Sequence, residues 1–138
     1  MDKNKNYHDE QNNMNTLKMR EVLTTLPPFC KQFFRGIQDY TSSRTRLAYA
    51  YDLRVFFEFM HENNPYCNKV GITELPLSVL DHISREDIEE YMEYLKVYNR
   101  EGERITNSEK GLSRKMSALR SFYQYYFKHQ MIEKNPTL

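Results

Sequence analysis

The 138-residue sequence predicts an all-α fold, a compact bundle of four to five helices. In several segments apolar residues recur at steps of three and four, the spacing of one helix face. Breaks rich in Asn, Pro, Gly or Ser separate these segments, and no segment alternates apolar and polar residues as a half-buried strand does. The 39% apolar and 14% aromatic content is enough for the core of one domain.

The two ends of the chain differ in character. Residues 1 to 14 are polar and rich in Asn, so they bury too little apolar surface to offset the entropy of ordering. We therefore expect a disordered polar segment at 1–14 and a helical domain at 15–138.

Four helices are expected in that domain. The first covers about residues 27 to 40, because two prolines suit a first helical turn. The second covers about 44 to 63, with Ser43 as its N-cap. The third follows Ser84 and Asp87, an acidic variant of the capping box. After a polar loop at 99–107, the last helix runs from about 111 to an Asn-Pro stop at 135–136, capped by Thr106 or Ser108.

The last helix is amphipathic and basic. Its apolar side carries residues at alternating steps of four and three. These residues are Leu112, Met116, Leu119, Tyr123 and Tyr126. Residues 104–128 contain six basic residues and one acid, whereas residues 74–93 contain seven acids and one basic residue. The net charge of +1 therefore conceals a strong asymmetry, and the basic helix suits a polyanion such as DNA. The alternative is an ordinary solvated face that binds nothing.

Common catalytic and metal-binding motifs do not occur in the sequence. It has no glycine-rich phosphate loop, no H-E-x-x-H and no C-x-x-C, so we expect no cofactor and no metal site. Cys30 and Cys67 are far apart, which predicts reduced structural thiols in a cytoplasmic protein. No apolar run approaches the roughly 18 residues of a membrane span, so no membrane association is expected.

Four segments carry a resemblance to a known family. They are Ser43 with Tyr49, Asp52, Leu53, Phe56 and Phe59; Ile83, Ser84, Asp87, Ile88 and Tyr91; the run 112–125; and Ile132 with Asn135 and Pro136. In this order they resemble the N-terminal core-binding domain of tyrosine recombinases of the phage-integrase type, over about residues 26 to 138. The resemblance implies a SAM-like helical domain that forms half of a clamp around double-stranded DNA.

The resemblance also implies what this chain lacks and what it works with. In that family a separate C-terminal domain carries an Arg–His–Arg set and a nucleophilic Tyr, and that catalytic domain is absent from this chain. We therefore expect no enzymatic activity from the chain, and we interpret it as part of a longer recombinase acting in DNA integration and recombination. The implied partners are duplex DNA, the chain's own catalytic domain and other copies of the protein on DNA.

The implied DNA contacts come from the second and last helices. On matching positions they are Arg44, Thr45, Arg46, Lys110, Arg114, Lys115, Ser117 and Arg120. The competing hypothesis is a helical protein–protein interaction module without DNA binding, in which the acidic segment 86–93 meets the basic last helix of a neighbouring protomer. A stand-alone enzyme ranks last, because no site for catalysis is visible in the sequence.

Overall fold

Five α-helices make up most of the chain in the computed structural model, which describes residues 3–138. They are α1 (Lys3–Leu23), α2 (Cys30–Gly36), α3 (Ser43–Asn63), α4 (Arg85–Tyr94) and α5 (Glu109–Lys128). Three short 3-10 helices lie in the connections: η1 (Gln38–Tyr40), η2 (Ile72–Glu74) and η3 (Leu77–His82). The predicted all-α class, with four to five helices, is confirmed.

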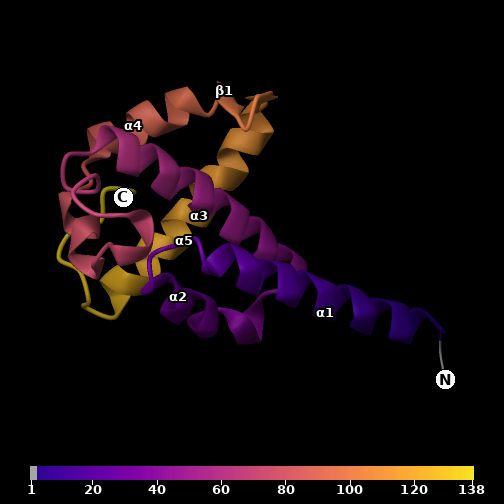
Figure 1. The fold of residues 1–138 in the computed structure, drawn as a ribbon. Helices are drawn as coiled ribbons and strands as arrows, with labels where there is room; N and C mark the ends of the chain where they lie inside the picture. The colour runs from indigo at the N-terminus through magenta and orange to yellow at the C-terminus, as the bar shows by residue number, and fades with distance from the viewer. Residues whose placement is uncertain (1–2) are drawn as a thin grey trace.

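Helix α3 is the centre of the bundle. It packs against α1, α4 and α5, and Figure 1 shows α1 running alongside it while α5 crosses it. Leu53, Phe56 and Phe57 of α3 are fully buried in this packing. Removing such side chains from water stabilises a fold by roughly 1.5–3 kcal/mol each, so α3 anchors the other helices.

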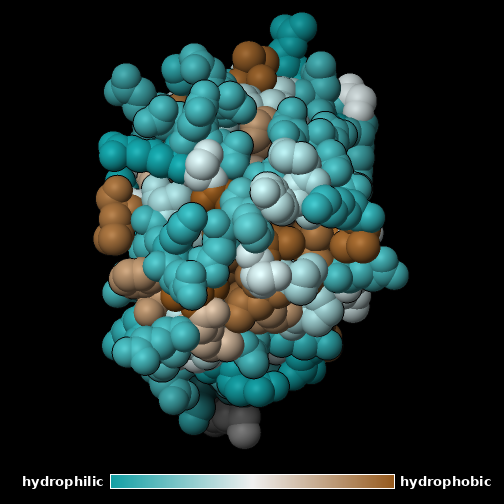
Figure 2. Space-filling model, turned by 90° about the vertical axis from the view of Figure 1, so that its left-hand side faces the viewer, coloured by the Kyte–Doolittle hydropathy of each residue, from teal (hydrophilic) through white to brown (hydrophobic). Residues whose placement is uncertain are grey.

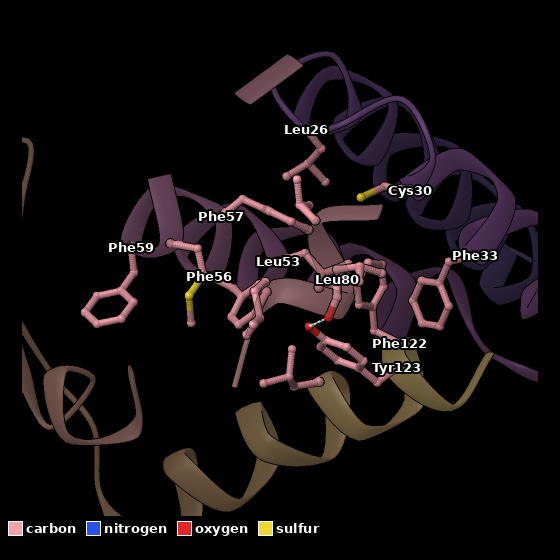
Figure 3. Packing of buried hydrophobic residues seen from close by; sticks show 14 of the residues in the cluster. Leu26, Cys30, Phe33, Leu53, Phe56, Phe57, Phe59, Leu80, Phe122 and Tyr123 are labelled. Carbon is pink, nitrogen blue, oxygen red and sulfur yellow. Dashed lines mark hydrogen bonds between the residues drawn. The ribbon is translucent and has the colours of Figure 1, made fainter. Parts of the chain in front are cut away.

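The core is rich in aromatic rings, and two buried tyrosines fix the position of α5. Figure 3 shows Phe122 and Tyr123 of α5 reaching into the cluster, where the Tyr123 hydroxyl donates to the Leu80 carbonyl at 3.1 Å. The Tyr126 hydroxyl donates to the Phe29 carbonyl at 2.5 Å. Burial raises the pKa of both phenols. Because these hydroxyls are buried and hydrogen-bonded, the core face of α5 has one defined orientation.

A glycine allows α2 to approach α5 closely. A Cβ atom at Gly36 would overlap the ring of Tyr125, so a larger residue there forces that ring or the backbone to move. Phe33 of α2 also packs edge-on against Tyr125, with 5.9 Å between ring centroids. The contact between α2 and α5 therefore depends on position 36 being glycine, which has no side chain.

Serine side chains cap the N-termini of α3, α4 and α5. In α4, Asp87 N donates to Ser84 Oγ at 3.1 Å and Ser84 N to Asp87 Oδ2 at 2.9 Å, the predicted capping box. Ser108 caps α5 by accepting from Gly111 N at 3.2 Å, which selects one of the two predicted caps. For α3 the prediction was one residue off, since the N-cap is Ser42, which accepts from Thr45 N at 3.1 Å.

The N-terminal segment differs from the expected disorder of residues 1–14. Residues 1–2 lie outside the described part, but residues 3–14 are helical and continue without a break into the rest of α1. The reason lies in contacts with α3. Ser43 is buried, its hydroxyl donates to Asn12 Oδ1 at 2.8 Å, and Asn15 Nδ2 donates to it at 3.2 Å. Two amides that looked like markers of disorder instead attach α1 to α3.

The predicted polar loop at 99–107 is wrong, because most of it forms a β-hairpin. Strands β1 (Val97–Arg100) and β2 (Glu103–Thr106) pair antiparallel, with Tyr98 opposite Ile105. The turn residues Glu101 and Gly102 have φ of 52° and 80°. Positive φ at both central residues is the signature of a type I′ turn, which is usually marked by Asn-Gly or Asp-Gly rather than Glu-Gly.

Two helix boundaries also need correction. The first predicted helix, 27–40, is divided into α2 and η1, and α2 begins only at Cys30. The last helix stops at Lys128, before the predicted Asn-Pro stop. Gln130 there has φ of 57°, and Met131 N donates to the Tyr126 carbonyl at 2.9 Å, a Schellman ending. Gln is not the usual residue at that position, so the sequence concealed the stop.

The surface is mainly hydrophilic. Figure 2 shows apolar side chains gathered in a band across the middle of one otherwise hydrophilic face. Cys30 and Cys67 are buried and unpaired with each other, in line with the predicted structural thiols. Within residues 3–138, no helix has both the length and the apolar content needed to cross a membrane.

Candidate nucleic-acid interface

One face of α5 carries polar residues along its whole length. We call this set the polar stripe: Lys110, Arg114, Ser117, Ser121, Gln124 and Lys128. Steps of four and three keep its members on one side of the helix, opposite the apolar residues that face the core. Eighteen residues separate its ends, so at 1.5 Å per residue the stripe is about 27 Å long.

A groove beside α3 contains most of the stripe. At one end is a hollow of about 410 Å³, where Thr45, Ala48, Tyr49 and Asp52 of α3 face the first half of the stripe. At the other end is a hollow of about 520 Å³, which the second half of the stripe shares with Tyr49 and the segment 36–41. Tyr49 lines both hollows, so the two adjoin, and we call them together the α3–α5 groove.

The cations of the stripe are available to a ligand. Lys110, Arg114 and Lys128 are exposed, and within residues 3–138 none of them pairs with a carboxylate. Between them lie two serine hydroxyls and the amide of Gln124, which can donate and accept hydrogen bonds. The stripe therefore combines positive charge at both ends with neutral hydrogen-bonding groups in the middle.

Lys115 does not belong to this face. Its ammonium lies 3.3 Å from Asp52 Oδ1, and the two side chains are only 22% and 19% exposed. Burial raises the pKa of Asp52, while the charge and the hydrogen bond of Lys115 oppose that rise. This predicted DNA contact is therefore occupied by an internal ion pair that links α5 to α3.

Arg46 is also occupied within the protein. Its Nη1 donates to the Gln38 carbonyl at 3.0 Å, to Thr41 Oγ1 at 3.1 Å and to the Thr41 carbonyl. These bonds attach η1 to the first turn of α3. Because the acceptors are neutral, the guanidinium is held in place while its charge is not cancelled.

The other predicted residues divide into two groups. Thr45, Lys110, Arg114 and Ser117 line one hollow together, and Arg44 is exposed on the same turn of α3 as Thr45. Arg120 instead lines a hollow between α4 and α5, on a different side of the helix. The structure thus brings four of the eight predicted residues to one end of the groove, with Arg44 exposed next to Thr45, and places Arg46, Lys115 and Arg120 elsewhere.

A family model decides how this arrangement is classified. The model described as the phage integrase N-terminal SAM-like domain matches residues 30–130. The chain belongs to this family. The matched range includes α2 through α5 and both sides of the α3–α5 groove, whereas α1 lies outside it.

Curated relatives of this SAM-like integrase domain are tyrosine recombinases. A tyrosine recombinase XerC from Caldanaerobacter subterraneus subsp. tengcongensis is 30% identical, over 88% of this chain and 36% of its own length. A XerS from Streptococcus mutans is 28% identical over 78% of the chain and 31% of its own length. The chain therefore spans about a third of these relatives, and no solved structure matches it significantly.

Three members of the stripe were not among the predicted site residues of this integrase domain. They are Ser121, Gln124 and Lys128. The signal for them was present, because they continue the steps of three and four that begin at Lys110. The same spacing that marks the apolar side of the helix, followed along its polar residues, separates the stripe from Lys115 and Arg120.

Proposed function

We propose that this chain binds double-stranded DNA by placing the polar stripe of α5 in the major groove, with Arg44 and Thr45 of α3 beside a phosphate strand. The observation that supports this is the stripe itself, an exposed helix face with unpaired cations at both ends. A major groove about 12 Å wide accepts an α-helix. Phosphates would be neutralised at the ends of the stripe, and hydroxyl or amide groups would face base edges in its middle.

The wider proposal concerns the whole protein. By similarity to the tyrosine recombinases above, the chain is the N-terminal half of a DNA clamp, and the catalytic domain lies in a part of the protein beyond this sequence. The whole protein would act as a site-specific recombinase in the cytoplasm, assembled from several copies on DNA. This chain would contribute binding and not chemistry.

The expected binding has a characteristic dependence on salt. Lys110, Arg114, Lys128 and Arg44 supply four cations, and each phosphate contact contributes about 0.9 to the slope of log K against log salt. The slope would then be near −3.6, and affinity would fall on the order of 100-fold between 50 and 200 mM salt. Binding to random-sequence duplex would be weak and largely independent of sequence.

A fluorescence titration of random-sequence duplex at several salt concentrations tests the proposal. The decisive variant is the triple substitution Lys110→Gln, Arg114→Gln and Lys128→Gln. Its matched control is Lys69→Gln, Lys96→Gln and Lys134→Gln, three exposed lysines outside the groove. The stripe variant should lose most of the affinity and of the salt dependence while retaining its helical circular dichroism.

Two results would contradict the proposal. One is an equal loss of affinity in the stripe variant and the control, which would indicate a diffuse charge effect. The other is no binding by the unmodified chain even at low salt. In that case, self-association in sedimentation experiments would support the interaction module, in which the acidic surface of α4 contacts basic residues of another copy.

A further inference from the structure

A second positively charged surface lies outside the α3–α5 groove. A hollow of about 470 Å³ is lined by residues of α1, of α2 and of the start of α3. Arg20 of α1, Lys31 and Arg35 of α2, and Arg46 of α3 line it, and among the residues that the structure describes no carboxylate does. We call it the α1–α2 hollow.

The charge of this hollow is not compensated within the described chain. Arg20, Lys31 and Arg35 are exposed, and among residues 3–138 none of them forms an ion pair. Arg46 bonds only to neutral oxygens of Gln38 and Thr41. Four like charges around one depression repel one another, so an anion that enters it relieves that repulsion.

The α1–α2 hollow adjoins the proposed DNA-binding groove. Along α3, Thr45 lines the groove and the next residue, Arg46, lines the hollow. Where α2 ends and η1 begins, Gly36 and Ile37 line the groove, whereas Arg35 and Gln38 line the hollow. The first turn of α3 and η1 therefore separate two neighbouring positive surfaces.

We propose that the α1–α2 hollow binds backbone phosphates of the same DNA duplex, beyond the part contacted by the polar stripe. This inference rests on the proposed function. Duplex DNA carries one negative charge per 1.7 Å or so of its axis, so a duplex in the groove presents further phosphates to adjoining surfaces. Three of the four cations are guanidinium groups, whose paired N–H donors match phosphate oxygens. Helix α1, which the family model does not cover, thereby extends the DNA contact.

The test is a triple variant, Arg20→Gln, Lys31→Gln and Arg35→Gln, titrated with duplexes of about 12 and 30 base pairs at several salt concentrations. Arg46 is left unchanged because it holds η1 to α3. The stripe, about 27 Å long, covers about eight base pairs of B-DNA, so the longer duplex also offers phosphates to the hollow. On that duplex the hollow adds to the salt dependence of the stripe and Arg44, so its loss should reduce the size of the total slope by about 2.7 and the affinity at 0.1 M salt by at least tenfold. The change on the shorter duplex should be smaller.

The matched control is again Lys69→Gln, Lys96→Gln and Lys134→Gln, with the fold of each variant checked by circular dichroism and thermal unfolding. If the stripe variant loses binding while the hollow variant keeps the full salt slope, this inference is overturned and the proposed function stands. If the stripe variant keeps its affinity for both duplexes, the inference and the proposed function are both overturned. If the hollow variant instead abolishes self-association of the free chain and leaves the slope intact, the hollow accepts acidic side chains of a second copy, which also overturns the inference.

Discussion

Helices α4 and α5 pack against the same central helix and present opposite charges to solvent. Both contact α3, and both begin with a serine cap. The outer surface of α4 carries exposed Glu86, Glu89, Glu90 and Glu93, whereas α5 exposes the polar stripe. The two helices thus share one structural role, and they differ in the ligand that each can attract.

The difference shows how a chain with a net charge of +1 can still present a surface on one side that would attract a polyanion. Acids are concentrated on α4, where Arg85 and Lys96 partly offset them through exposed pairs with Glu89 and Glu93 at 3.7 and 3.8 Å. Such surface pairs contribute little stability. The separation of charge instead gives the surface a direction, because a polyanion would be repelled by the acids of α4 and attracted by the cations of α5.

The largest expected effect comes from removing charge on α5. The double substitution Lys110→Gln and Arg114→Gln should weaken duplex binding on the order of 50-fold near 0.1 M salt, because each lost phosphate contact removes close to a tenfold factor there. Neutralising two acids of α4, Glu86→Gln with Glu90→Gln, should raise affinity by less than about twofold, since those charges are screened from DNA in the groove. Fluorescence anisotropy of labelled duplex measures both. If the two variants changed the duplex affinity by equal factors in opposite directions, binding would depend only on the net charge of the chain.

The next largest effect is expected on stability, at the close contact between α2 and α5. Gly36→Ala should lower the free energy of unfolding by about 1–3 kcal/mol, because its methyl group overlaps the ring of Tyr125, which is held on its other sides by Phe33 and Tyr126. Urea denaturation measures it. Gly71→Ala is the matched control, since a Cβ there meets only Glu74 Oε2 at 4.0 Å and should change stability by less than about 0.5 kcal/mol.

If Gly36→Ala and Gly71→Ala have the same free energy of unfolding, the close approach of α2 to α5 does not contribute to stability. A lower DNA affinity in folded Gly36→Ala would further show that Tyr125 helps to shape the groove, which it lines.

Much of the contrast between α4 and α5 could be predicted from the sequence. The capping box of α4, the apolar side of α5 and the separation of acids from bases all follow from local spacing, and local spacing decides which side chains share a helix face. The family resemblance was carried by these same positions and is confirmed.

What the sequence did not reveal depends on contacts between distant segments. Lys115 looks like its neighbour Arg114 in the sequence, but its partner Asp52 lies 63 positions earlier. Arg46 is a local case, since Thr41 and Gln38 are only five and eight positions earlier and the fold of that short segment turns them toward its side chain. The asparagines at 12 and 15 looked disordered because their partner belongs to another helix. Spacing assigns a side chain to a face of its own helix, but only packing shows whether that face is occupied.

A smaller effect is expected from the ion pair at the edge of the groove. Asp52→Asn removes a carboxylate from the groove and releases Lys115, so DNA affinity near 0.1 M salt should rise by up to about tenfold, the factor for one added phosphate contact. The pKa of Asp52 is raised, so lowering the pH toward the acid range protonates it in the folded chain before an ordinary Asp. Affinity of the unmodified chain should therefore approach that of the variant as the pH falls.

The same raised pKa has a consequence for folding. Any stability that protonated Asp52 confers is fully present below its unfolded-state pKa, near 3.8, and is lost as the pH rises through its higher folded-state pKa. Denaturation of the unmodified chain and of Asp52→Asn between about pH 3 and pH 7 should show that the unmodified chain loses stability relative to the variant as the pH rises.

The DNA titration has its own contradicting outcome. If the affinity of Asp52→Asn for DNA is lower than that of the unmodified chain, Lys115 needs its partner in order to hold α5 in position.

The smallest effect is expected in the hairpin that joins the acidic helix to the basic one. Glu101 adopts φ of 52° at the first central position of the turn, where Asn is accepted more readily than Glu. Glu101→Asn should stabilise the fold by less than about 1 kcal/mol, because the gain in the turn is reduced by loss of the exposed pair with Arg100 at 3.5 Å. Arg100 keeps its bond to Glu58 at 3.0 Å, so the hairpin stays attached to α3. DNA affinity should stay within about twofold of the unmodified chain, since one exposed charge outside the groove is largely screened. A large change in affinity would mean that the hairpin, and not only α3, sets the position of the first turn of α5.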